Sequence, residues 1–393
     1  MAGPEDHYHH EVLPPDVRFD GGGSNYFRPE LLVVGDAEVV AEVNRRLGQE
    51  PRGEYDEVAG VTKVPIGPDE DVLAKVAELR SPEPGVRNSA GLPVYVNQVL
   101  RGMGHAMPKA GSPPRPATEA DAMPLPATVE GSTVRIAVLD SGVDAGAAAG
   151  PWLAPFASGP DDFATVTNGT LDRYCGHGTF IAGILRRHAP GAAIEVSHVF
   201  DGSGFTDDFT VAQELHALAS AGVQVVSLSF GGYTFDNLAP PAMEAAIYAL
   251  RDVDVAIVAA AGNENTSRPC WPAAFKGVVA VGALDAAGGK ACFSNYGSWV
   301  NACAEGVDVV STFVHSGAPA APVTAPAGCP EVPPAPGGFA GFARWSGTSF
   351  AAPRVAAAVA REVTELVGPS RAVFNLLHAG TAHSHPGLGV HVT

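Results

Sequence analysis

The hydrophobic pattern is most regular in the part of the chain that follows residue 130. There, near-continuous apolar runs alternate with stretches in which apolar residues recur at helical spacing. The strand candidates are 134–140, 193–200, 223–229, 255–261 and 278–284, and the helix candidates are 179–187, 208–221, 240–251 and 348–367. Strands that are apolar on both faces and separated by helices are typical of a parallel sheet covered by helices on both sides. The pattern predicts a doubly wound α/β domain over residues 131–393.

The preceding part of the chain has a shorter and different pattern. A strand is predicted at 31–34, a helix at 37–47, one or two strands within 57–66, a helix ending near 79 and a strand at 92–100. This strand–helix–strand–strand–helix–strand order is typical of a ferredoxin-like split βαβ. We therefore expect a small α+β domain at 29–100, although an unrelated small α+β module would show the same pattern.

Segments of low hydrophobic content separate these domains. Residues 1–28 are expected to form a flexible arm, and the Pro/Gly-rich stretch 101–130 a linker, because such compositions bury too little apolar surface to order themselves. A second Pro/Ala/Gly-rich tract at 315–341 contains Cys329 and is interpreted as a surface loop inserted before Ser349.

Charge and cysteine content restrict the partners and the compartment. The chain has 24 Lys+Arg against 42 Asp+Glu, a formal net charge of −18, which argues against nucleic acid or an anionic membrane as a partner. No uninterrupted apolar stretch is long enough for a transmembrane helix. The polar N-terminus and the odd number of cysteines, 5, favour a cytoplasmic location, with non-classical export left open.

Three glycine-flanked polar residues are candidates for covalent catalysis. Asp140 ends an apolar run, His177 lies in Gly-His-Gly-Thr, and Ser349 begins an alanine-rich helical segment after Gly347. A serine at this position could simply be a helix N-cap. A serine hydroxyl becomes a nucleophile when an imidazole takes its proton and a carboxylate holds the imidazole in the right tautomer. The three residue types together therefore indicate nucleophilic acyl transfer.

The motifs Asp-Ser-Gly, Gly-His-Gly-Thr and Gly-Thr-Ser-x-x-Ala-Pro, in this order, resemble those of the subtilisin-like serine protease (subtilase) family. The resemblance implies a subtilisin-like fold and a serine endopeptidase that acts through an acyl-enzyme. It implies that Ser349 is the nucleophile, His177 the general base and Asp140 the orienting carboxylate. Asn263 matches the family residue whose side chain donates to the oxyanion together with the Ser349 N–H. Two alternatives remain: a non-catalytic peptide-binding pseudoprotease, and an esterase or ligase with the same triad.

The same resemblance assigns two walls of a substrate pocket. They are Ser229, Phe230 and Gly231 on one side and Ala260, Ala261 and Gly262 on the other. The match also implies that Cys270 lies near the pocket floor and Glu264 near its rim, so both apolar and basic side chains remain possible substrates. Phe180 departs from the family, in which a histidine commonly follows Gly-His-Gly-Thr.

The position of residues 29–100 resembles that of the family's propeptide, a folding chaperone and temporary inhibitor. The expected partners are therefore protein or peptide substrates and the chain's own N-terminal domain as an intramolecular inhibitor. The final strand of that domain can lie in the cleft as a substrate mimic, followed by self-cleavage between about Leu100 and Glu130.

No cofactor is expected for catalysis. Structural Ca²⁺ is possible in this family, but the acidic pairs 161–162 and 207–208 lack calcium-loop spacing and are expected to be solvated. The histidines at 7, 9 and 10 are interpreted as part of a solvated tail. Cys175 is expected to be a plain buried thiol, and Cys292 and Cys303 are candidates for a disulfide with each other in an oxidising compartment.

Overall fold

The computed structural model describes the chain with several gaps. The described residues are 18–19, 26–51, 55–67, 69–86, 90–102, 113–122, 124–127, 134–160, 166–167, 170–171, 174–200, 204–315, 317–318, 329, 337–379 and 384–393. The chain forms two compact units. The first contains residues 1–100, 206–217 and 232–250, and the second contains 101–205, 218–231 and 251–393. The predicted domain boundaries stay a prediction.

The second unit is built on a large, mainly parallel sheet, as the apolar runs predict. Its strand order is β20-β21-β17-β16-β15-β13-β7-β11-β8. The pairs from β17 to β8 are parallel, and β20 pairs with β21 antiparallel. The strands are β7 (Arg135–Asp140), β8 (Ala157–Ser158), β11 (Ala193–His198), β13 (Val225–Leu228), β15 (Ala256–Ala260), β16 (Val278–Leu284), β17 (Ala302–Glu305), β20 (Ser384–His385) and β21 (Gly389–His391).

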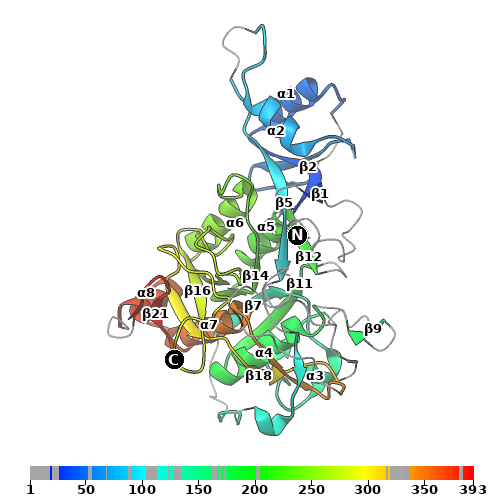
Figure 1. Cartoon of the computed structure of the whole chain (residues 1–393). Helices are drawn as coiled ribbons and strands as arrows, with labels where there is room; N and C mark the ends of the chain where they lie inside the picture. The colour runs from blue at the N-terminus through cyan, green and yellow to red at the C-terminus, as the bar shows by residue number, and fades with distance from the viewer. Residues whose placement is uncertain are drawn as a thin grey trace. The chain divides into compact units, whose positions relative to one another are not determined.

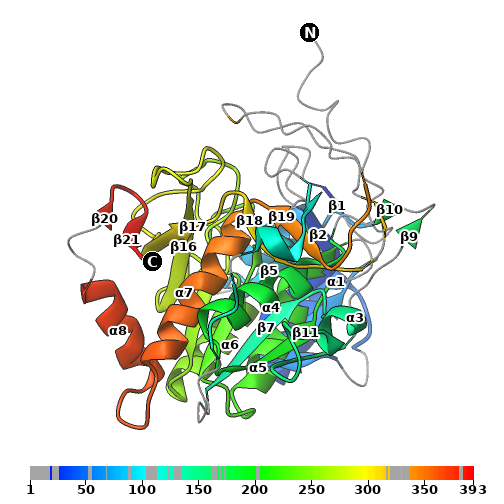
Figure 2. The same cartoon turned by 90° about the horizontal axis from the view of Figure 1, so that it is seen from below.

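Two helices of this unit begin at the candidate site. They are α4 (His177–His188) and α7 (Thr348–Glu362), which lie side by side (Figure 2). The other helices are α3 (Ala145–Ala149), α8 (Pro369–Ala379) and the short 3-10 helix η2 (Glu119–Asp121). The helix expected to reach residue 367 ends at Glu362. The Thr364 hydroxyl accepts the N–H groups of Leu366 and Val367, and this local turn competes with helix continuation.

The sequence pattern did not indicate the smaller antiparallel pieces of the second unit. One sheet joins β18 (Val309–Thr312), β19 (Phe342–Trp345) and β6 (Arg115–Pro116), and another joins β9 (Val166–Thr167) and β10 (Thr170–Leu171). Strand β19 ends at Trp345, four residues before Ser349. The β18–β19 pair therefore leads directly into the start of α7.

Within the first unit, the elements between residues 26 and 102 follow the predicted strand–helix–strand–strand–helix–strand order, and one further short strand precedes them. The elements of this unit are β1 (Arg18–Phe19), β2 (Tyr26–Val34), α1 (Ala37–Leu47), β3 (Glu57–Val58), β4 (Val61–Pro65), α2 (Val72–Arg80) and β5 (Val94–Gly102), of which the last two residues belong to the second unit. Strands β5, β2, β4 and β3 pair antiparallel in that order, and α1 and α2 cover the sheet (Figure 1). Leu31, Val43 and Leu79, each 0% exposed, lie in the core between them.

Three further elements lie mostly within the segments 206–217 and 232–250, which belong to the first unit. They are β12 (Phe205–Asp207), which pairs with β5, and the helices α5 (Asp208–Leu218) and α6 (Pro241–Asp252). The acidic pair at the start of α5 was expected to be solvated, and this is wrong. Asp207 is 7% exposed and Asp208 is 0% exposed, because main-chain N–H groups of α5 and β5 bind these carboxylates.

The cysteine pairing also differs from the expectation. Cys292 forms its disulfide with Cys329, with 5.4 Å between the Cα atoms, and not with Cys303. Cys303 lies within β17, is 0% exposed, and directs its Sγ to the Val390 carbonyl at 3.6 Å. Burial raises the pKa of the Cys303 thiol to about 12, so this thiol is both covered and protonated.

Some expectations fall outside the described residues. They concern most of the arm 1–28 with its histidines, residues 103–112, 123 and 128–130 of the linker, the acidic pair 161–162, and most of the tract 315–341. Within the described part of the chain, no helix is long and apolar enough to cross a membrane. The same residues contain no group of three or more His, Cys, Asp or Glu side chains that could hold a metal ion.

Candidate active site

Asp140 and His177 form a buried pair in the second unit. Asp140 is the last residue of β7, both side chains are 0% exposed, and His177 Nδ1 lies 2.8 Å from Oδ1 and 2.9 Å from Oδ2 of Asp140. The Ser141 N–H also donates to Asp140 Oδ1 at 2.8 Å. An ionised carboxylate only accepts, so Nδ1 carries the proton of the ring. In the neutral imidazole, Nε2 is therefore the basic nitrogen.

The glycines on either side of His177 allow a close approach that a side chain would block. Gly176 precedes the helix with φ 79°, and a Cβ there would lie 2.3 Å from the Phe313 ring. A Cβ on Gly178 would lie 2.2 Å from the Gly142 carbonyl oxygen. The Gly178 N–H donates instead to Ser141 Oγ at 3.0 Å. The Asp-Ser-Gly and Gly-His-Gly motifs thus interlock, which fixes the imidazole against the carboxylate.

Aromatic side chains pack around the imidazole of His177. The ring centroids of Trp345 and Phe350 lie 5.4 Å and 5.6 Å from that of His177, and Phe180 lies 4.6 Å from Phe350. Phe180, the residue that departs from the family motif, is 0% exposed and belongs to this apolar cluster. A phenyl ring suits this position, because it fills apolar surroundings without requiring a polar partner.

Ser349 is the second residue of α7, one position before Phe350, and is 0% exposed. Its Oγ donates to the Ser229 carbonyl oxygen at 3.1 Å, and Ser229 Oγ donates in return to the Ser349 carbonyl oxygen at 3.1 Å. Among the described residues, His177 Nε2 has no hydrogen-bond partner. In this state the serine hydroxyl is therefore bonded to the Ser229 main chain and not to the imidazole.

Asn263 follows β15 and is tied directly to the residue before Ser349. Its Oδ1 accepts the Thr348 N–H at 2.8 Å and the Thr348 hydroxyl at 2.9 Å, and the Gly262 N–H donates to that hydroxyl at 3.1 Å. A main-chain N–H can only donate, so the side-chain atom that faces Thr348 must be the oxygen. The Nδ2 group of Asn263 is consequently directed away from Thr348.

The predicted wall residues occupy two buried segments of the second unit. Ser229 and Phe230 are 0% exposed, and β14 (Phe230–Gly231) pairs antiparallel with the end of β5, with Gly102 opposite Phe230 and Arg101 opposite Gly231. On the other wall, Ala260 and Ala261 are 0% exposed. Gly262 has φ 102°, and a Cβ there would lie 3.5 Å from Cys270 Sγ, so Cys270 lies close behind this wall.

Two residues near this site were missed by sequence reasoning. Thr348 was considered only as part of the serine motif, and no role was predicted for Asn295. Asn295 is 0% exposed and donates from Nδ2 to the Ala261 carbonyl oxygen at 2.8 Å. The available signal for Asn295 was weak, because this residue follows only the short apolar stretch 291–293 and one serine.

These features define an α/β protein of subtilisin type. The structure is similar to fervidolysin from Fervidobacterium pennivorans, a keratinolytic enzyme related to subtilisin, with a TM-score of 0.63 and 21% identity over 98% of this chain and 63% of that one. It is also similar to the protease domain of PatA, with a TM-score of 0.53 and 24% identity over 67% of this chain and 92% of that one. At these identities the likeness concerns the fold alone.

Sequence comparison identifies the family. The sequence profile of the subtilase family matches residues 131–367, and the chain belongs to this family of serine proteases. It is 35% identical to thermitase from Thermoactinomyces vulgaris over 203 residues, which are 48% of this chain and 68% of thermitase. It is 31% identical to subtilisin Savinase from Lederbergia lenta over 240 residues, which are 58% of this chain and 76% of the relative.

Proposed function

We propose that the protein is a serine endopeptidase in which Ser349 attacks the peptide carbonyl carbon. His177 Nε2 takes the Ser349 hydroxyl proton and later gives it to the leaving amine. Water then attacks the acyl-enzyme while His177 Nε2 takes a proton from it, and His177 returns this proton to Ser349 Oγ as the acid product leaves. Asp140 holds the ring in the required tautomer and stabilises the imidazolium. The observation that carries the proposal is the buried carboxylate that binds His177 Nδ1 and leaves Nε2 available as the base.

Attack requires the serine hydroxyl to change its hydrogen-bond acceptor. In the structure the hydroxyl donates to the Ser229 carbonyl oxygen, whereas the mechanism requires it to donate to His177 Nε2. Rotation about the Cα–Cβ bond of Ser349 changes the direction of this hydroxyl while the main chain of α7 stays in place. Catalytic hydrogen bonds are often formed only when substrate is bound, so the observed bond is compatible with a resting enzyme.

The negative charge that develops on the substrate oxygen needs donors that are already in place. We assign this role to the Asn263 Nδ2 group and to the Ser349 N–H. The bonds from Thr348 to Asn263 Oδ1 support the assignment, because they identify Nδ2 as the donor end of this amide and connect the amide to the start of α7. Main-chain N–H groups in the first turn of a helix have no partner within the helix, and the helix dipole favours negative charge there.

The family and the first unit also support the proposal that the chain is made as a self-inhibiting proenzyme. The last residues of β5 pair with Phe230 and Gly231 as an added strand, on the segment assigned to the substrate wall. The antiparallel order β5-β2-β4-β3 supports a ferredoxin-like topology for residues 29–100. Since β5 ends at Gly102, we expect the cut between residues 102 and 130.

The catalytic proposal is tested with Ser349→Ala and the matched control Ser346→Ala. Ser346 is also buried, 7% exposed, and accepts the Asp308 N–H, but it lies outside the assigned site. Ser349→Ala should lower peptide hydrolysis by on the order of 10⁴–10⁶-fold, whereas Ser346→Ala should retain it. Undiminished turnover by Ser349→Ala would contradict the assignment, and peptide binding without turnover by the parent would indicate a pseudoprotease.

The proenzyme proposal has a separate test, the intact mass of the purified protein. The parent should yield a fragment that begins between residues 103 and 130, and Ser349→Ala protein should stay full length under the same conditions. A parent that stays uncut and fully active would show that residues 29–100 are not an inhibitory propeptide, and the triad assignment would be unaffected.

A further inference from the structure

The main chain of the loop that carries Asn263 has positive φ on both sides of this residue. Gly262 has φ 102° and Asn265 has φ 51°, so the main chain enters the left-handed region on both sides of Asn263 and Glu264. Glycine and asparagine are among the residues that adopt this region most readily, and contacts with the surroundings fix the conformation that the loop keeps. Several of the contacts that hold this loop, residues 261–266, come from the segment 293–296.

Asn295 bonds this loop at several points. Its Nδ2 donates to the Ala261 carbonyl oxygen at 2.8 Å, and its Oδ1 accepts the N–H groups of Glu264 and Thr266, each at 3.1 Å. Its own N–H donates to the Gly262 carbonyl oxygen at 2.9 Å. These bonds fall on both sides of Asn263, and the amide side chain of Asn295 provides the donor for one of them and the acceptor for two.

The fit around Asn295 leaves little freedom for another arrangement. A Cβ on Gly262 would lie 2.4 Å from Asn295 Nδ2, so the loop main chain rests directly on the amide. The preceding residue anchors Asn295 to the sheet. Ser294 Oγ accepts the N–H of Ala283 in β16 at 2.9 Å and donates to the Asn295 carbonyl oxygen at 3.0 Å.

We propose that Asn295 is a positioning residue for catalysis, which holds the loop so that the Asn263 amide meets the oxyanion of the transition state. This rests on the proposed function of Asn263 as the oxyanion donor. Asn295 acts through the main chain of Ala261, Glu264 and Thr266 and has no role as a donor to substrate. A donor aimed at a developing charge is effective only when it is preorganised, so loss of Asn295 should reduce turnover more than substrate binding.

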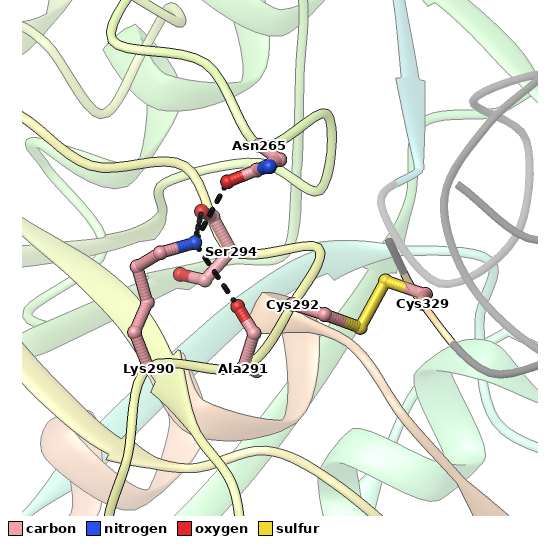
Figure 3. The surroundings of a disulfide bond; sticks show 6 residues. All are labelled: Asn265, Lys290, Ala291, Cys292, Ser294 and Cys329. Carbon is pink, nitrogen blue, oxygen red and sulfur yellow. Dashed lines mark hydrogen bonds between the residues drawn. A yellow bond between two sulfur atoms is a disulfide. The ribbon is translucent and has the colours of Figure 1, made fainter. Parts of the chain in front are cut away.

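Lys290 provides the matched control, because it binds the outer end of the same loop (Figure 3). Its Nζ donates to Asn265 Oδ1 at 2.8 Å and to the carbonyl oxygens of Ala291 and Ser294 at 3.2 Å and 3.1 Å. These bonds reach a side chain of the loop and two carbonyls outside it. Lys290→Met should therefore affect stability more than turnover.

The experiment is a double-mutant cycle with steady-state kinetics on a peptide substrate. Asn295→Ala should lower kcat by on the order of 10–100-fold with little change in KM, and Asn295→Asp, which keeps both acceptor bonds, should recover part of the loss. Asn263→Ala should lower kcat by about 10²–10³-fold. The double variant should be no slower than Asn263→Ala, because Asn295 acts through Asn263. Lys290→Met should leave kcat nearly unchanged.

The outcomes separate the two assignments. Active-site titration of each variant first corrects kcat for the folded fraction, and Asn295→Asp replaces Asn295→Ala in the cycle if the latter does not fold. Losses that multiply in the double variant, or a loss confined to KM, would overturn the positioning role of Asn295. An unchanged kcat in Asn263→Ala would instead overturn the oxyanion role of Asn263, on which this inference rests.

Discussion

Two buried aspartates, one in each unit, show how differently the same side chain can be used. Asp140 and Asp208 are both 0% exposed. Asp140 receives the His177 Nδ1–H and the Ser141 N–H, so it faces a ring that can carry positive charge. Asp208, at the start of α5, receives the Gln98 N–H at 3.1 Å, and its Oδ2 has no partner among the described residues. Burial, together with the neighbouring Asp207, raises the pKa of Asp208 well above its usual value.

The difference lies in the partners and not in the degree of burial. A carboxylate beside an imidazole can stabilise a transient cation, which is useful in catalysis. A carboxyl group that is buried close to a second acid is costly to ionise, even though its main-chain N–H bonds favour the charged form. The surroundings of Asp208 are a connected polar cluster: the Phe209 N–H donates to Asn97 Oδ1 at 3.3 Å, and Asn97 Nδ2 donates to Glu30 at 2.7 Å. Lys63 interacts electrostatically with Glu30 and Asp207.

The largest expected effect comes from removing the charge of Asp140. Asp140→Asn keeps the size of the side chain, but an amide N–H can face Nδ1 and favour the wrong imidazole tautomer. We expect kcat to fall by about 10⁴-fold with a much smaller change in KM, measured on a peptide substrate near neutral pH. Retention of most of the turnover would mean that Asp140 is a structural residue like Asp208.

An intermediate effect is expected from Asp208→Asn. This variant should change the pH dependence of stability and leave the catalytic reaction unaffected. Because the folded pKa of Asp208 is raised, the unfolded chain loses this proton first, and stability falls as pH rises from about 3.9 towards the raised folded value. An asparagine at position 208 does not ionise, so this fall of stability with pH disappears, while the amide Oδ1 still accepts the Gln98 N–H. Hydrogen exchange of the α5 and β5 amides in Ser349→Ala protein, between about pH 5 and about pH 8, should show a flatter profile in the variant. Identical profiles would contradict the raised pKa.

The smallest effect is expected from Asp207→Asn, the matched control. Asp207 Oδ1 accepts the Thr210 N–H at 3.0 Å, a cap that an asparagine retains. Its charge is one cause of the raised pKa of Asp208, so its removal should lower that pKa only in part. The same exchange experiment should give a profile between those of the parent and Asp208→Asn. A profile as flat as that of Asp208→Asn would assign the pH dependence to Asp207 itself.

The catalytic region could be predicted from the sequence because its constraints leave a residue pattern. Gly176 and Gly178 approach other atoms too closely for any side chain, so the histidine motif is visible in the sequence. The parallel strands are apolar on both faces and give an equally clear signal. Whether Asp140, His177, Asn263 and Ser349 have their assigned roles stays a prediction, although the structure places Asp140 beside His177 and Asn263 beside Thr348.

Other features depend on contacts between distant segments, which leave no local pattern. The Cys292–Cys329 disulfide joins residues 37 positions apart, and one partner lies in a tract of unpatterned composition. The burial of Asp208 depends on Gln98, 110 positions away, so two adjacent acids were read as solvated. Asn295 was missed for the same reason, because its bonds reach a loop about 30 positions earlier. The cytoplasmic location also stays a prediction.

The most direct test of the account is the site of covalent modification by a fluorophosphonate. The probe should form a single adduct with the parent, and peptide mapping should place the adduct on Ser349. Asp140→Asn should slow the labelling strongly, and Ser349→Ala should abolish it. Hydrolysis of peptides by a parent that forms no adduct, or an adduct on a serine other than Ser349, would contradict the proposal that Ser349, His177 and Asp140 together form the catalytic centre.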